Sequence, residues 1–200
     1  MGSTGRFIGG RSDRRLRTRR GSVETVRFEQ ATGDHRRKSW VRRTARLVSE
    51  AGCSRVLVVT GADGDRVAAE VNDLADTVVV HHEGWEGGMG SSIAAGARAL
   101  AGLESCRGVL LLTCDLPELD VTILKNLIEA FEGEPRRIVS CAYAGTVGIP
   151  VLFGSDWFDR LAQLDGDRGA KALLLEHPGR RIDIEWPPGA ADRDRREGGG

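Results

Sequence analysis

Long apolar runs and export signals are both missing from this 200-residue chain, and each absence excludes a class of protein. No apolar run approaches the roughly 20 residues that a membrane-spanning helix needs. The N-terminus is positively charged but has no apolar stretch after it, so we expect no secretory signal there. The apolar share of 40% and the charged share of 29% are typical of a soluble globular domain.

Cysteines are few, and their spacing argues against structural cross-links. Cys53, Cys106, Cys114 and Cys141 form no C-x-x-C pair, and each lies in or beside an apolar segment. A zinc site or a disulfide framework is therefore not expected. Reduced, mostly buried thiols fit better, and such thiols are usual in the cytosol. With no export signal, this predicts a cytoplasmic protein without a membrane partner.

Histidines are also few, and none forms a pair at metal-ligand spacing. His81 and His82 are adjacent and follow an apolar run, but neighbouring side chains on a strand point to opposite faces. We therefore assign them no catalytic role. No Ser-His-Asp arrangement can be argued from the sequence either.

Charge is balanced overall but unevenly distributed. Residues 1–50 hold 14 of the 29 basic and 5 of the 29 acidic residues, a balance of +9, so the remainder carries −9. This arrangement predicts either an anion-binding segment or a tail that is folded unlike the rest. Arginines bind phosphates readily, but the acidic body argues against a nucleic-acid partner. So does the wide separation of Phe7 and Phe28, which leaves the arm without an aromatic platform.

After the N-terminal segment, apolar strands alternate with helices. The predicted strands are Arg55–Thr60, Thr77–Val80, Gly108–Thr113, Arg137–Ala142, Pro150–Phe153 and Arg181–Trp186. The predicted helices are a segment capped by Ser39 and stopped by Gly52, then Asp65–Leu74, Ser91–Leu100, a segment from the cap Asp120 to Phe131, Ser155–Leu164 and Gly169–His177. Apolar strands separated by helices predict a parallel sheet that is covered on both faces.

Residues 1–37 show no period of 2 or 3.6. We therefore expect an α/β domain over residues 38–197, an atypical Arg-rich segment over residues 1–37, and a first strand that is weak or missing. In an open parallel sheet, ligands bind where loops leave the carboxyl ends of the strands. The loops after Thr60, Val80 and Thr113 are thus the candidates for a site.

Two of these loops contain motifs with a chemical rationale. Residues 86–92 (EGGMGSS) are rich in glycine and stand directly before a helix, where backbone N–H groups can approach an anionic ligand. Asp115 follows a buried strand, where its carboxylate could hold Mg²⁺. Each motif also has a plainer interpretation: a flexible loop with a serine cap, and an aspartate that caps a turn.

Three further stretches are candidates with weaker support. In residues 166–171 (GDRGAK), Asp167 could cap a helix while the basic residues face phosphate. Residues 148–150 (GIP) form a tight start to a strand. The run 192–197 (DRDRRE) offers a second metal oxygen, although a mixed charge run is usually a solvated tail.

Together and in this order, the motifs resemble those of the molybdenum cofactor cytidylyltransferase family, within the MobA-like NTP transferases. The resemblance spans residues 39–197 and rests on the stretches 86–100 (EGGMGSSIAAGARAL), 109–120 (VLLLTCDLPELD), 148–153 (GIPVLF), 164–174 (LDGDRGAKALL) and 192–197. It implies a Rossmann-like three-layer sandwich with a mostly parallel sheet, of the nucleotide-diphospho-sugar transferase type.

The resemblance also implies a reaction, in which CTP and a molybdopterin-type cofactor give the cytosine dinucleotide form and pyrophosphate. Mg²⁺ would bridge the phosphates. Carried onto this sequence, the metal ligands are Asp115 and Asp194, the nucleotide loop contains Gly88, Gly90 and Ser92, and the cofactor side contains Asp167 and Gly148. The finished cofactor would pass to a molybdoenzyme or to its chaperone.

The family's triphosphate loop, L-A-A-G-x-S-x-R-M-G-x-x-K, has its nearest counterpart in residues 7–19. Gly10, Ser12 and Arg14 align with this motif, and Arg19 falls at the lysine position. The resemblance therefore implies that Gly10 and Ser12 bind the nucleotide. It also makes Arg14 and Arg19 candidates for catalysis. Leu16 replaces a glycine, and leucine cannot adopt a positive φ cheaply. Arginine keeps the charge of lysine but not its compact geometry.

Two explanations fit these departures: an altered triphosphate site, or a segment translated from a displaced reading frame. Three functions therefore remain open: a cytidylyltransferase, a guanylyltransferase of the same fold, and a catalytically impaired protein that still binds nucleotide or cofactor. The G-G-M-G-S-S stretch favours the cytidine branch, by resemblance alone.

Overall fold

The computed structural model describes residues 22–28, 35–100 and 105–190. In this part of the chain, seven strands form one sheet in the order β3-β2-β1-β4-β6-β5-β7. Their bounds are β1 Ser22–Phe28, β2 Arg55–Thr60, β3 Thr77–His81, β4 Cys106–Thr113, β5 Ile138–Tyr143, β6 Thr146–Gly154 and β7 Arg181–Glu185.

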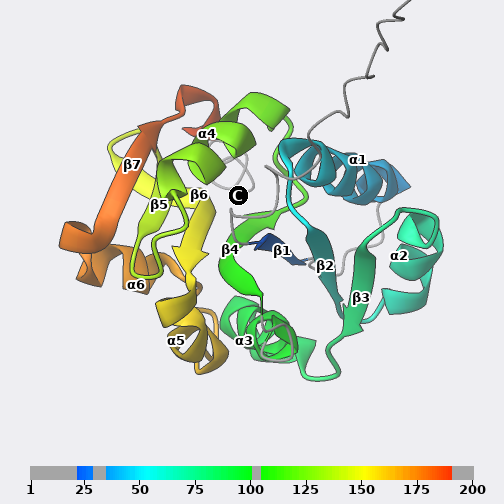
Figure 1. The fold of residues 1–200 in the computed structure, drawn as a ribbon. Helices are drawn as coiled ribbons and strands as arrows, with labels where there is room; N and C mark the ends of the chain where they lie inside the picture. Colours follow the sequence, from blue (N-terminus) through cyan, green and yellow to red (C-terminus); the bar gives the residue numbers. More distant parts are fainter. Residues whose placement is uncertain (1–21, 29–34, 101–104, 191–200) are drawn as a thin grey trace, which may run out of the picture.

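Helices cover both faces of this sheet (Figure 1). They are α1 His35–Ala51, α2 Gly64–Val71, α3 Met89–Leu100, α4 Val121–Phe131, α5 Phe158–Ala162 and α6 Lys171–Glu176. Helices α1, α2 and α4 pack on one face, and α3, α5 and α6 pack on the other. This confirms the predicted three-layer α/β sandwich. Over the described residues, none of these helices is both long and apolar enough to span a membrane.

Alternation along the strands explains why both faces need cover. In β2, Val56 and Val58 point into the core beneath α1, whereas Leu57 and Val59 point into the core beneath α3. Strand β4, on the other side of β1, divides in the same way, and its side chains in both cores are almost fully buried. A strand that is apolar on both faces is stable only inside such a sandwich.

The sheet is parallel except for one strand. β1 pairs in parallel with β2 and with β4, and β5 pairs in parallel with β7. β6 lies between β4 and β5 and runs antiparallel to both. The start of β6 therefore lies beside the carboxyl end of β4, which agrees with the pairing of Leu111 with Val151.

The strand at the centre of the sheet differs most from the sequence prediction. The sequence pattern predicted a weak or missing first strand, whereas Ser22–Phe28 forms β1 between β2 and β4. Phe28 pairs with Val59 on one side and Thr113 on the other, so β1 and β4 end at the same edge. The predicted boundary between residues 37 and 38 stays a prediction, and β1 lies on its N-terminal side.

The start of α1 also differs from the prediction, whereas its end and the start of α4 agree with it. Ser39 was expected to cap α1, but α1 begins at His35, so Ser39 lies inside the helix. Gly52 does end this helix, with a φ of 103°. The prediction for α4 is confirmed, because Asp120 caps it by accepting hydrogen bonds from the backbone N–H groups of Thr122 (2.7 Å) and Ile123 (3.0 Å).

Candidate functional site

Two loops that are distant in the sequence meet at the carboxyl edge of the sheet. The glycine-rich loop, residues 84–90, joins β3 to α3, and the second loop, residues 165–170, leads from α5 to α6. The backbone N–H of Gly90 donates a hydrogen bond of 2.8 Å to the carbonyl oxygen of Gly166. The structure thus brings together two motifs that the sequence offered separately.

Close packing explains why glycine occupies this junction. A Cβ atom on Gly90 would lie 2.6 Å from the carbonyl oxygen of Asp165, and one on Gly88 would lie 2.7 Å from that of Gly166. Gly88 also has a φ of 91°, a conformation that residues with a side chain rarely adopt. The loops can approach this closely only because neither glycine carries a side chain.

Asp167 lies at the same junction. Its carboxylate is among the atoms that a Cβ on Gly88 would strike. It was considered as a cap for the following helix, but that helix begins at Lys171 and has no side-chain cap. Asp167 therefore faces the glycine-rich loop, and the two predicted site residues Gly88 and Asp167 are neighbours.

The first turn of α3 is held by side-chain hydrogen bonds. Ser91 was expected to cap the helix, but α3 begins two residues earlier, at Met89. The Oγ of Ser91 donates to the carbonyl oxygen of Gly88 (2.8 Å), and it lies 3.0 Å from the Nε2 of His82. Ser92 follows in the same turn and is half-buried. The glycine-rich loop is therefore a defined structure with its own polar contacts.

The two adjacent histidines point in different directions, as the strand geometry predicted. His82 faces Ser91 and Gly84, whereas the ring of His81 lies beside Gly64, at the start of α2. Trp85 packs over Gly61, where a Cβ would lie 2.5 Å from the indole ring. The loop after β2 and the glycine-rich loop therefore form one continuous surface.

Asp115 follows β4 at the same edge of the sheet and is half-buried. The loop that carries it is fastened to α1, because the guanidinium of Arg43 donates to the carbonyl oxygens of Leu119 (2.6 Å) and Leu116 (3.4 Å). Asp115 thus projects from a loop with a fixed backbone. That arrangement suits a carboxylate that must keep a constant position.

The described residues fit Mg²⁺ bound partly by substrate. Among them, no cluster of three or more His, Cys, Asp or Glu side chains could hold a metal ion by itself. Mg²⁺ usually binds one or two carboxylates and completes its shell with water and substrate phosphates. A single well-placed carboxylate such as Asp115 is enough for that mode of binding.

Gly148 lies near the start of β6, and therefore on the same side of the sheet as the end of β4. The Tyr143 hydroxyl lies against Gly148, in the space that a side chain would fill. The Tyr143 ring meets Trp186 edge to face, with the centroids 6.2 Å apart. This aromatic pair therefore packs beside the start of β6.

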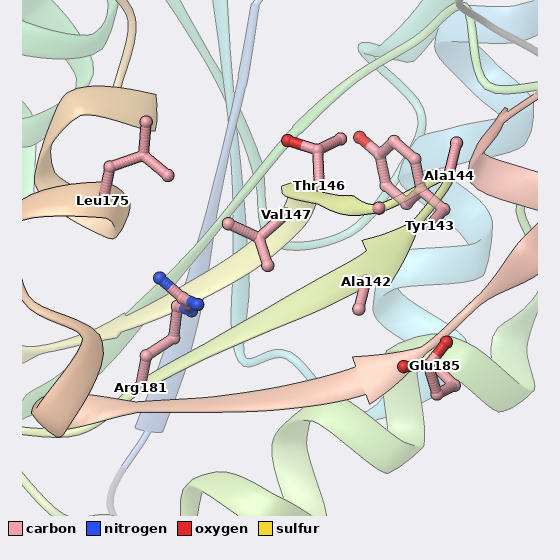
Figure 2. Close-up of a pocket in the computed structure, with 9 residues that line it drawn as sticks. Ala142, Tyr143, Ala144, Thr146, Val147, Leu175, Arg181 and Glu185 are labelled. Atoms are coloured by element: carbon pink, nitrogen blue, oxygen red, sulfur yellow. The ribbon is translucent and has the colours of Figure 1, made fainter.

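A pocket of about 340 Å³ adjoins this region, between the β5–β6 hairpin, β7 and α6. In Figure 2, Val147 and the guanidinium of Arg181 point into the same space, which Leu175 borders from α6. The remaining lining residues are Ala142, Tyr143, Ala144, Gly145, Thr146 and Glu185. The guanidinium of Arg181 already has hydrogen-bond partners within the protein, because it donates to Asp183 and to the carbonyl oxygen of Leu174. The lining of the pocket therefore mixes polar and apolar surface.

The other predicted site residues lie outside the described part of the chain. They are Gly10, Ser12, Arg14, Arg19 and Asp194, and their roles stay predictions. The first four precede β1 in the sequence.

The contacts of His82, Arg43 and Tyr143 were not predicted. His82 was considered and given no catalytic role, although its position directly after β3 and just before the glycine-rich loop is a signal that the sequence offers. Arg43 contacts the loop after β4, and Tyr143 contacts Gly148. These contacts join separate segments of the chain, so no local sequence pattern signals them.

Comparison with known proteins identifies a family and a related protein. The profile of a family described as the MobA-like NTP transferase domain matches residues 9–181. Nicotine blue oxidoreductase of Paenarthrobacter nicotinovorans is 30% identical over 152 residues, which cover 72% of this chain and 72% of that protein.

Two solved structures share the fold. A nucleotidyl transferase from Methanothermobacter thermautotroptrophicus matches with a TM-score of 0.66 and 20% identity, over 82% of this chain and 87% of that chain. The complex of Rv0371C from Mycobacterium tuberculosis H37Rv with manganese matches with a TM-score of 0.61 and 24% identity, over 83% of this chain and 89% of that chain. At these identities, the structures establish the fold alone.

Proposed function

Because this chain belongs to the MobA-like NTP transferase domain family, we propose that it transfers CMP from CTP to a molybdopterin-type cofactor and releases pyrophosphate. The chain is an enzyme of the nucleotidyltransferase type. The choice of nucleotide, the acceptor and the metal are parts of our proposal. We further propose that the product passes to a molybdoenzyme or to its chaperone.

The observation that carries the proposal is the arrangement of loops at one edge of the sheet. The glycine-rich loop is locked to the loop carrying Asp167, and Asp115 follows β4 at the same edge. A close-packed glycine loop at a helix start supplies backbone N–H groups to an anionic ligand, and a carboxylate at the same edge of the sheet supplies a metal ligand. A nucleotide with its metal ion needs both.

In this proposal, the protein acts mainly by positioning. Mg²⁺, when bound, would offset the charge that develops on the phosphates during transfer. Asp115 would hold the ion, and the Arg43 contacts with the loop would keep the carboxylate in place. The glycine-rich loop would bind the nucleotide, and the edge beside Gly148 would receive the acceptor. Holding both substrates together removes much of the entropic barrier to their reaction.

The experiment is a measurement of pyrophosphate release with a molybdopterin-type acceptor, using Mg-CTP and Mg-GTP separately. We expect release with CTP, and a loss of at least about 100-fold in Asp115→Asn because the metal ligand is weakened. Glu118→Gln is the matched control, since Glu118 lies exposed in the same loop. Release with GTP alone would establish the guanylyltransferase instead. Nucleotide binding without release would identify the impaired binding protein.

A second candidate function is an oxidation or reduction of a small molecule, and one observation favours it. The curated relative at 30% identity is named an oxidoreductase, so membership of this family does not by itself fix the reaction. Incubation with nicotine blue and a reduced nicotinamide nucleotide, followed by absorbance, tests this candidate. Loss of colour without pyrophosphate release from CTP would replace the first proposal with the second.

A further inference from the structure

His82 connects three parts of the proposed nucleotide site. Its backbone N–H donates to the carbonyl oxygen of Thr60 at the end of β2 (2.9 Å). Its backbone carbonyl accepts from the N–H of Trp85 (3.2 Å) within the glycine-rich loop. Its Nε2 lies 3.0 Å from the Oγ of Ser91, directly after that loop in the first turn of α3. One residue therefore links a strand end to the loop and to the start of α3.

The hydroxyl of Ser91 lies between the Nε2 of His82 (3.0 Å) and two backbone carbonyl oxygens, that of Gly88 at 2.8 Å and that of Gly84 at 3.3 Å. Carbonyl oxygens can only accept, and Ser91 has one hydroxyl proton to give. Ser91 therefore bonds both to a carbonyl and to His82 only when it accepts from a protonated Nε2, and both the Nε2-protonated neutral ring and the imidazolium supply that proton. In this arrangement, the side chain of His82 fixes the direction in which Ser91 donates.

That direction matters because of the peptide group it holds. The carbonyl of Gly88 and the N–H of Met89 belong to the same planar peptide, and α3 begins at Met89. The first N–H groups of a helix have no partner within the helix and are the donors that anions bind. A bond to the Gly88 carbonyl therefore sets the orientation of the first donor of α3.

We propose that His82 is a positioning residue: it acts through Ser91 to hold the Gly88–Met89 peptide in the orientation that nucleotide binding needs. The proposal rests on the proposed function of the glycine-rich loop. A purely structural role is the competing explanation, because the ring also packs on Gly84, where a Cβ would lie 3.2 Å from the ring carbon Cε1. The two roles differ in their need for a donor on Nε2.

The test compares substitutions that keep or remove this donor. His82→Gln places an amide N–H near the position of Nε2, whereas His82→Leu keeps bulk without a donor. His81→Leu is the matched control, since His81 is adjacent and lies against Gly64 instead. The affinity for Mg-CTP is measured by calorimetry, and KM and kcat are measured from pyrophosphate release.

We expect His82→Leu to weaken nucleotide binding and raise KM by about threefold to tenfold, the range for one lost hydrogen bond, with kcat changing less. His82→Gln and His81→Leu should stay within about twofold of the wild type. Ser91→Ala should match His82→Leu, and the double variant should be no worse than either single one. Equal losses in the Gln and Leu variants, or additive losses in the double variant, would overturn the proposal.

Hydrogen exchange in the nucleotide-free protein separates this proposal from the function it rests on. Amides of residues 84–92 should exchange faster in His82→Leu than in the wild type, and at the wild-type rate in His82→Gln. If the wild type binds no nucleotide, the proposed function fails. Unchanged exchange in His82→Leu would instead refute the role of His82 in ordering the loop, whatever the nucleotide result.

Discussion

The backbone N–H of Gly90 donates to the carbonyl oxygen of Gly166 at 2.8 Å, although the two glycines lie in different halves of the chain. Gly90→Ala tests how much depends on this bond. Its Cβ would lie 2.6 Å from the carbonyl oxygen of Asp165, and backbone atoms cannot move aside as a flexible side chain can. We expect a loss of about 1–3 kcal/mol in the free energy of unfolding, measured by urea denaturation.

The control for this substitution is Gly179→Ala. A Cβ on Gly179 meets nothing within 4 Å, so the wild-type stability should be kept. If both variants were equally stable, the two loops would not be packed together as described.

Arg43 should affect turnover more than stability. It donates to the carbonyl oxygens of Leu116 and Leu119 from an exposed position on α1. We expect Arg43→Ala to cost about 1 kcal/mol of stability, because its hydrogen bonds are exchanged for bonds to water. Pyrophosphate release should fall by a larger factor, since the loop that carries Asp115 loses its anchor. Arg46→Ala, at an exposed position on the same helix, should change neither quantity.

Asp120→Ala should destabilise the domain by about 1 kcal/mol, the usual effect of losing a helix cap. Asp120 accepts from two backbone N–H groups at the start of α4, and alanine leaves both unsatisfied. Asp120→Asn retains an acceptor oxygen and should recover most of the loss. Thermal denaturation of the three proteins checks this, and a loss in the asparagine variant equal to that in the alanine variant would contradict it.

The contribution of Asp183 to the stability of the protein should be present at neutral pH and lost at acidic pH. Burial alone would raise the pKa of Asp183, but hydrogen bonds from Arg181 and Ser140 outweigh it, and the pKa is lowered. A carboxyl group with a lowered folded-state pKa stabilises the protein above its ordinary pKa of about 4. That contribution is lost as the pH falls through the lowered value.

Asp183→Asn should therefore be less stable than the wild type at neutral pH. The difference in the free energy of unfolding should shrink as the pH falls below about 4. Urea denaturation of both proteins across this range measures it. A difference that stayed constant with pH would show that the charge of Asp183 contributes nothing.

The cysteines should be unreactive in the folded protein. All four are buried and form no disulfide, and burial raises the pKa of Cys141 to about 12. Because only the thiolate reacts with Ellman's reagent, the native protein should not be labelled near pH 8, whereas the unfolded chain should show four thiols. Rapid labelling of the native protein would mean that one of these cysteines reaches solvent.

Sequence patterns predicted those elements whose local signals agree with their packing. The bounds of β2 match the prediction because a β-branched run lies between glycines at 52 and 61. α4 matches because Asp120 has no competing role and caps it directly. The start of α3 was misplaced because the hydroxyl of Ser91 bonds backward to Gly88 instead of capping the helix.

The site was harder to predict because its defining contacts are between segments. The glycine-rich loop and the loop of Asp167 each carried a recognisable motif, but no spacing in the sequence shows that Gly90 and Gly166 touch. β1 was missed for a different reason. Its sequence, SVETVRF, is interrupted by Glu24 and Arg27, so it lacks the continuous apolar run that identified β2.

Because β6 runs antiparallel to its neighbours, the short turn between β5 and β6 can change in length without displacing the strands of the sheet. The tight turn that precedes β6 has positive φ at Ala144 (48°) and Gly145 (70°), and it rises beside the pocket of Figure 2. Residues inserted there would extend a rim without shifting any parallel strand, whereas an insertion within a crossover helix would disturb the layer above it. Insertions or deletions at this hairpin turn would thus change the shape of the adjoining pocket with little effect on the rest of the fold.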